Sequence, residues 1–255
     1  MQLVSTIESR ESILLYGGPA SGKSRAVLSI ARKCPNSQVH IVDNDYAYER
    51  LLETEFDDVQ NVTVYEVDSE DWKEQLDTAA KAKEECGRDD WFAFDMATET
   101  WQAVQSWFTQ KVYGMDHADY FMQLRMNKDA KSKQNVELVQ DDRWTVINNE
   151  YKKLQRLWLP SKKCHVICTA EAATLSPFDV GDTKKTFGEY QFKPKGQKRT
   201  GHLFSTVILM EKKRVGSWMM TTVKDRGRAE VEQKEVTDFA MDYLMKVAKW
   251  RPTQS

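Results

Sequence analysis

The sequence contains no long apolar stretch, and none of its hydrophobic runs approaches the roughly 18 residues that a membrane-spanning helix needs. The first residues, MQLVSTIESR, also lack the basic start and apolar centre of a secretory signal. We therefore expect a cytoplasmic protein that has no membrane partner.

Cysteine is scarce, with 4 residues and no CxxC pair. This usage excludes a disulfide-stapled secreted domain and is typical of a reducing compartment. Cys164 and Cys168 flank His165, but they lie in an apolar strand pattern without a second pair of ligands. We interpret them as buried thiols and not as a metal site.

Neither sign of charge dominates, since 37 Lys and Arg residues stand against 39 Asp and Glu residues. A chain without excess positive charge has no general attraction for nucleic acid, so any such surface must be a local basic patch. The hydrophobic content of 40% is typical of a globular protein. A length of 255 residues can bury one substantial core, and we predict a single domain over 1–255, with its core at about 11–228.

A glycine-rich turn, Gly17 to Gly22, joins an apolar run to a helical pattern that begins at Lys23 and Ser24. This is the GxxxxGK[ST] spacing in its strand-to-helix setting. Glycines let backbone N–H groups approach phosphates closely, and the helix start adds positive potential. Lys23 can then reach the terminal phosphates, while the Ser24 hydroxyl can ligate Mg²⁺.

We predict a nucleotide phosphate site for ATP and Mg²⁺, and the alternative is an ordinary glycine turn. The residues expected to form it are Gly17, Gly18, Pro19, Ala20, Ser21, Gly22, Lys23, Ser24 and Arg25.

The rest of the chain alternates between short apolar runs and helical patterns. The runs that predict strands are 13–16, 38–42, 62–67, 91–95 and 165–170. Strands separated by helices indicate βαβ units and a mostly parallel sheet flanked by helices. Two late runs, 203–211 and 218–223, predict an antiparallel C-terminal strand pair. We expect irregular structure over 113–142, a long loop or hairpin over 171–200 and a C-terminal helix over about 234–250.

Asp95 ends the apolar run WFAFD. In an open α/β sheet the carboxyl ends of the strands form the ligand crevice, so we expect Asp95 beside a Mg²⁺ ion that Ser24 also holds. A helix cap at Asp95 is the alternative, and the two roles are compatible.

Further carboxylates are candidates for the base that polarises an attacking water. Asp43 and Asp45 end the second strand, and we choose Asp45 as the base, although Asp-Asn-Asp is also ordinary turn chemistry. Glu99 and Glu171 are competing candidates. Glu171 follows the fifth strand, where a polar residue could sense the γ-phosphate.

The order of these motifs, with TAEA after the fifth strand, resembles the RecA-like P-loop NTPase core over roughly 13–228. It is similar to phage-encoded RecA-like ATP-binding proteins, including the group associated with single-strand annealing recombination. The resemblance implies a RecA-like fold, a second-strand base at about Asp45 and, for a phage protein, the host cell cytoplasm.

The late segment KDRGR, Lys224 to Arg228, resembles the KNRFG motif of the RadA branch. The resemblance implies that Lys224 and Arg226 reach the nucleotide of a neighbouring protomer, in a homo-oligomeric ring or filament with intersubunit ATP sites. Asp225 replaces Asn here, and Gly227 arrives one residue early without the Phe. A solvated basic turn is the alternative.

The resemblance also places DNA-contacting loops within 113–142 and 172–200. The second loop has basic residues for phosphate attraction and, between them, Phe187, Tyr190 and Phe192 for base stacking. An ordinary solvated loop is the alternative. The residues expected to bind single-stranded DNA are Lys184, Lys185, Lys193, Lys195, Lys198 and Arg199.

We therefore predict a Mg²⁺-dependent, DNA-stimulated ATPase of phage recombination or replication that acts on single-stranded DNA, with a single-strand binding protein as a further partner. Its expected catalytic residues are Lys23, Asp45, Asp95, Glu171, Lys224 and Arg226. Two alternatives stay open: a P-loop small-molecule kinase and a non-catalytic, nucleotide-gated protein-binding module.

Overall fold

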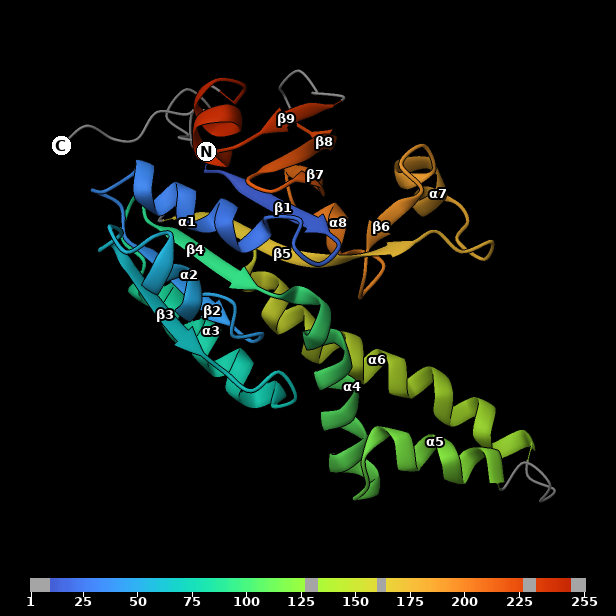
Figure 1. The fold of residues 1–255 in the computed structure, drawn as a ribbon. Helices are drawn as coiled ribbons and strands as arrows, with labels where there is room; N and C mark the ends of the chain where they lie inside the picture. The colour runs from blue at the N-terminus through green and yellow to red at the C-terminus, as the bar shows by residue number, and fades with distance from the viewer. Residues whose placement is uncertain (1–9, 127–132, 160–163, 227–232, 249–255) are drawn as a thin grey trace, which may run out of the picture.

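The computed structural model describes residues 10–126, 133–159, 164–226 and 233–248 (Figure 1). Its strands form a sheet in the order β3-β2-β4-β5-β1-β7-β8-β9, and β6 pairs with β5 off this path. The strands are β1 (Ser12–Gly17), β2 (Val39–Asp43), β3 (Val62–Glu66), β4 (Trp91–Asp95), β5 (His165–Thr174), β6 (Phe192–Pro194), β7 (Thr206–Arg214), β8 (Ser217–Asp225) and β9 (Lys234–Val236).

Pairing is parallel from β3 to β7 and antiparallel between β7 and β8 and between β8 and β9. The prediction of an α/β fold with a mostly parallel sheet and an antiparallel C-terminal pair is confirmed. The helices are α1 (Lys23–Lys33), α2 (Glu49–Thr54), α3 (Trp72–Glu85), α4 (Ala97–Tyr113), α5 (His117–Met126), α6 (Lys133–Leu157), α7 (Asp182–Phe187), α8 (Thr200–Leu203) and the π-helix η3 (Ala240–Met245). Figure 1 shows α4, α5 and α6 extending away from the sheet.

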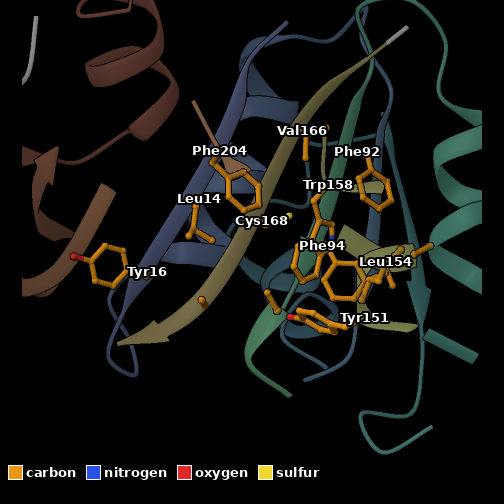
Figure 2. Close-up of a cluster of buried hydrophobic side chains, with 14 of the residues drawn as sticks. Leu14, Tyr16, Phe92, Phe94, Tyr151, Leu154, Trp158, Val166, Cys168 and Phe204 are labelled. Carbon is orange, nitrogen blue, oxygen red and sulfur yellow. The ribbon is translucent and has the colours of Figure 1, made fainter. Parts of the chain in front are cut away.

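Alternate residues of β1 face two separate hydrophobic layers, as the strand period requires. Ile13 and Leu15 pack with α1 and η3 on one face. Leu14 and Tyr16 pack on the other face, in a cluster that includes side chains of α3, α4 and α6. Figure 2 shows this second cluster, in which the ring of Trp158 lies 5.5 Å from that of Phe94. Both faces of β1 are buried, so the P-loop begins from a rigid base.

The strand order sets the position of the site. β5 lies between β1 and β4, with Leu15 opposite Thr169 on one side and Phe94 opposite Cys168 on the other. Because these strands are parallel, their carboxyl ends meet at the same edge of the sheet. The P-loop, the end of β4 and the middle of β5 therefore converge there.

Two secondary-structure predictions were wrong, whereas the hairpin alternative for 171–200 was right. Within 113–142, α5 and the start of α6 replace the expected irregular structure in the described part, while 127–132 lie outside the described residues. In the 171–200 segment the end of β5 pairs antiparallel with β6, which is the expected hairpin, and α7 lies in the connection between the two strands. The segment expected to form a helix over 234–250 begins as β9, where Val236 pairs with Trp218, and continues only as short η3; 249–250 lie outside the described residues.

Candidate nucleotide site

The P-loop needs glycine at both ends for steric reasons. A Cβ at Gly17 would lie 2.1 Å from the carbonyl oxygen of Met210, and Gly22 has a φ of +86° with the Trp218 ring 2.8 Å from an ideal Cβ. L-residues with side chains rarely adopt such a positive φ. The Gly22 conformation places Lys23 and Ser24 in the first turn of α1.

The Lys23 ammonium folds back over its own loop. Nζ donates to the carbonyl oxygens of Gly17 and Gly18, each at 3.1 Å, and lies 3.4 Å from Ser21 Oγ. Burial lowers the pKa of Lys23, and the nearby Asp95 carboxylate opposes that shift. Carbonyl partners are weaker than phosphate oxygens for a cation, so a bound phosphate can take over this ammonium.

The Asp95 carboxylate is 1% exposed and accepts hydrogen bonds from hydroxyl groups on three segments. Ser24 Oγ lies 2.8 Å from Oδ2, and the Tyr48 hydroxyl lies 2.6 Å from the same oxygen. Thr169 Oγ1 donates to Oδ1. The predicted meeting of Asp95 and the P-loop is therefore present in the fold, across 71 residues of sequence.

The oxygen atoms of Ser24 and Asp95 are suitable ligands for a magnesium ion. A carboxylate and a hydroxyl are hard oxygen ligands, and Mg²⁺ commonly takes one or two protein oxygens and completes its shell with phosphate and water. Within the described ranges, no group of three or more His, Cys, Asp or Glu side chains could hold a metal without other ligands. Ser24 and Asp95 are the residues that would hold Mg²⁺ here.

Asp43 and Asp45 occupy different positions at the end of β2. Asp43 is buried, and its carboxylate accepts the backbone N–H groups of Asp45 at 3.2 Å and Tyr48 at 3.4 Å. Asp45 is more exposed and lines the cavity beside Lys23. Partial burial, then the Asp95 charge, raise the pKa of Asp45 to about 8. Asp43 thus holds the loop, and Asp45 is the carboxylate that faces the cavity.

Glu171 also lines this cavity, opposite Gly17 at the last pair of the β1–β5 register. Its backbone N–H donates to Thr98 Oγ1 at 2.8 Å, and Lys195 Nζ lies 2.6 Å from its carboxylate. Glu99 lines a separate hollow between α3 and α4. Of the two competing carboxylates, Glu171 is the one that lines the cavity beside the P-loop.

The cavity next to the P-loop has a volume of about 670 Å³. Arg50, Leu51 and Thr54 of α2 line it on one side, and Val215 and Trp218 of the β7–β8 hairpin line it on another. Its dimensions lie in the range of small-molecule sites. The P-loop residues in its lining are Pro19, Ala20, Ser21, Gly22, Lys23, Ser24 and Arg25.

Lys224 is engaged within its own chain. Its ammonium donates to the carbonyl oxygens of Gly201 at 3.2 Å, His202 at 3.3 Å and Phe204 at 2.5 Å. Burial lowers the pKa of Lys224, and Arg226 adds to this effect. These contacts compete with the predicted reach of Lys224 into a neighbouring protomer.

The rest of the KDRGR segment divides into a buried and an exposed part. Asp225 is buried and accepts hydrogen bonds from Tyr243 at 2.5 Å and Thr206 at 3.2 Å. Arg226 is exposed just after β8. Gly227 and Arg228 lie outside the described residues.

The basic side chains of the 172–200 segment fall into two groups, those that form ion pairs within the chain and other, exposed ones. Lys193 pairs with Asp179 at 2.5 Å, and Lys195 pairs with Glu171, so intramolecular carboxylates already engage these two charges. The other four basic side chains of this segment are exposed: Lys184, Lys185, Lys198 and Arg199.

The expectation that Phe187 offers a stacking surface was wrong. Its ring is 5% exposed and packs edge-on against Tyr16 at 6.1 Å. Tyr190 and Phe192 are partly buried and pack against the same core. These aromatic side chains anchor the segment to the sheet because they bury apolar area there.

Sequence reasoning missed four residues that shape the site: Asn44, Tyr48, Thr169 and Trp218. Asn44 is buried, and its amide bonds the backbone of Met96 in both directions, at 3.0 and 2.6 Å. Thr169 had a detectable signal as the polar residue in the apolar run HVICTA. Tyr48 and Trp218 had none, because an aromatic residue in a hydrophobic pattern predicts core packing.

In the part of the chain that the structure describes, no helix has the length and apolarity to cross a membrane. Neither a family model nor a curated protein matches the sequence. Among solved structures, the fold is similar to the crystal structure of the RadB recombinase, with 13% identity, a TM-score of 0.49, and coverage of 89% of this chain and 87% of that one. At these values the likeness assigns no activity to the chain.

Proposed function

We propose that this protein is a RecA-like, Mg²⁺-dependent P-loop ATPase of DNA recombination, of the kind that phages encode, acting on single-stranded DNA as an oligomer. The observation that carries the ATPase proposal is the 2.8 Å contact between the buried Asp95 and Ser24, which lines the cavity together with Lys23. A phosphate-binding turn, a metal-binding hydroxyl and a strand-end carboxylate are the parts that nucleotide hydrolysis needs.

The residues of the site have different roles in nucleotide binding and hydrolysis. The P-loop N–H groups and Lys23 bind the phosphates, and Ser24 and Asp95 hold the metal. When bound, Mg²⁺ would neutralise phosphate charge. Asp45 accepts a proton from the attacking water, and Glu171 lies where it can respond to the terminal phosphate. Asp45 acts only in its ionised form; burial and the Asp95 charge raise its pKa to about 8, and the nearby Lys23 opposes that rise.

Exposed basic side chains support an oligomer that binds DNA. Arg226 is exposed at the end of β8, where a neighbouring protomer could present its nucleotide. The exposed charges of the 172–200 segment offer phosphate contacts. Electron microscopy with a non-hydrolysable ATP analogue, with and without single-stranded DNA, tests assembly and DNA binding together.

The direct test of the nucleotide site is ATP binding with Mg²⁺ by calorimetry, in the wild type and in Lys23→Ala. We expect affinity to fall at least about 100-fold, since a charged phosphate contact is lost. Lys33→Ala is the matched control, because Lys33 lies at the far end of the same helix. Equal ATP affinity in wild type and Lys23→Ala would refute the proposal. Phosphate release supports hydrolysis, whereas transfer to a nucleoside would identify a kinase.

A further inference from the structure

Tyr48 lies at the start of α2 and is completely buried. Its ring belongs to the hydrophobic layer that contains Ile13, Leu15 and α1. Its hydroxyl nevertheless points to a carboxylate and lies 2.6 Å from Asp95 Oδ2. A phenol that only filled the core would leave its O–H without a partner, at a cost of about 1–3 kcal/mol. The position therefore requires an aromatic ring and a hydrogen-bond donor together.

The Asp95 carboxylate has its orientation fixed by donors on both oxygens. Tyr48 shares Oδ2 with Ser24, and Thr169 donates to Oδ1. Tyr48 and Thr169 are both 0% exposed, so water does not compete for these bonds. A carboxylate can accept about four hydrogen bonds, and these hydroxyls occupy most of that capacity.

The donors come from elements that packing holds in place. Thr169 is in β5, between β1 and β4 in the sheet. Tyr48 precedes α2, and its backbone N–H donates to the buried Asp43. Asp43 also accepts the N–H of Asp45, so one short loop connects Tyr48 with the proposed base.

We propose that Tyr48, together with Thr169, is a positioning residue for the metal-binding pair Ser24 and Asp95. The inference rests on the proposed function, because it assigns a task toward Mg²⁺. The two hydroxyls hold the carboxylate in one orientation before a cation arrives. They act through Asp95 and do not touch the nucleotide. Groups that orient a metal ligand typically change metal affinity about 10–100-fold when they are removed.

The test measures ATP affinity against Mg²⁺ concentration, with a parallel series in EDTA, for the wild type and Tyr48→Phe. We expect Tyr48→Phe to bind ATP as tightly as the wild type in EDTA. It should need at least about 10-fold more Mg²⁺ to reach half of the metal-dependent gain in affinity. A role in packing alone would not move that midpoint, because the Phe ring preserves the packing.

Tyr243→Phe is the matched control. Tyr243 is another buried tyrosine whose hydroxyl donates to a buried aspartate, Asp225, at 2.5 Å. It lies in η3, in a different element from the Ser24–Asp95 pair. The control should lose comparable stability and keep the wild-type Mg²⁺ midpoint.

Thr169→Val provides a second, independent variant if Tyr48→Phe does not fold. It removes the donor on Oδ1 and should raise the Mg²⁺ midpoint in the same direction. An unchanged midpoint in the folded Tyr48→Phe protein, or in Thr169→Val when Tyr48→Phe does not fold, would overturn the inference. A wild type that binds no ATP, or gains nothing from Mg²⁺, would overturn the proposed function as well, and the wild-type series identifies that case.

Discussion

The indole N–H of Trp218 donates a hydrogen bond to the carbonyl oxygen of Ala20, 3.1 Å away and 198 residues earlier in the chain. The Trp218 ring also lies against the backbone of Gly22, and the centroid of the ring is 5.5 Å from the Arg25 guanidinium carbon. The β7–β8 hairpin thus supports the P-loop from the side, and the loop conformation depends on a distant strand.

Gly22→Ala should damage this arrangement more than an ordinary glycine substitution would. It combines a φ of +86° with a Cβ that would lie 2.8 Å from the Trp218 ring. We expect a loss of about 2–4 kcal/mol in unfolding free energy and at least about 10-fold in ATP affinity. Urea denaturation and calorimetry measure the two quantities. Gly114→Ala is the control, because Gly114 has a φ of +67° with open space around it, so it should lose only about 1 kcal/mol and no affinity.

The raised pKa of Asp45 predicts how the stability of the protein without nucleotide or metal depends on pH. Its folded pKa of about 8 lies above its usual value, so the folded state keeps a proton that the unfolded state has lost. Stability should therefore fall as pH rises from about 5 to about 9. Asp45→Asn removes this contribution, so the variant gains stability relative to the wild type as pH rises. Urea titrations across this range measure the difference, and a constant difference would contradict the raised pKa. Asp58→Asn is the control, since its lowered pKa places its titration below this range.

The exposed lysines of α7 should contribute to binding of single-stranded DNA. Reversing Lys184 and Lys185 to Glu should weaken affinity at least about 10-fold and reduce its salt dependence, because two phosphate contacts are lost. Fluorescence anisotropy at several salt concentrations measures both effects. Reversing Lys81 and Lys152, which are exposed on α3 and α6, makes the same change in net charge and should have a smaller effect. Equal losses in the two variants would assign the effect to net charge and remove α7 from the DNA surface.

We expect Lys224 to contribute to stability and Arg226 to contribute to catalysis. Lys224→Met removes contacts to three carbonyl oxygens and should cost about 1–3 kcal/mol of unfolding free energy. Arg226→Ala changes an exposed side chain and should alter stability by no more than about 0.5 kcal/mol, yet lower ATP turnover about 100-fold or more if it acts across subunits.

Mixing Arg226→Ala with Lys23→Ala subunits tests the action across subunits directly. Some interfaces of such a mixture contain one intact P-loop and one intact Arg226. Turnover should therefore recover partly above that of either variant alone. Absence of recovery in mixed oligomers would place Arg226 outside the neighbouring site.

The sequence alone determined the α/β class, the P-loop, the β4 bounds at Trp91 and Asp95, and the pairing of Ser24 with Asp95. These features could be predicted because they depend on local order: glycine spacing, apolar runs and a carboxylate at a strand end. Helix α5 and strand β9 could not, because weak local periodicity leaves their conformation to packing and strand pairing.

Only the tertiary structure decided how the other polar groups are used. Asp43 and Asp45 look equivalent in sequence, but the fold buries one as a backbone acceptor and leaves the other facing the cavity. Lys195 looks available for DNA, yet it pairs with Glu171. Tyr48 looks like a core residue, yet it orients Asp95. A side chain's type sets which bonds it can make, whereas its partners come from segments distant in sequence, and only the folded sheet brings them within hydrogen-bond distance.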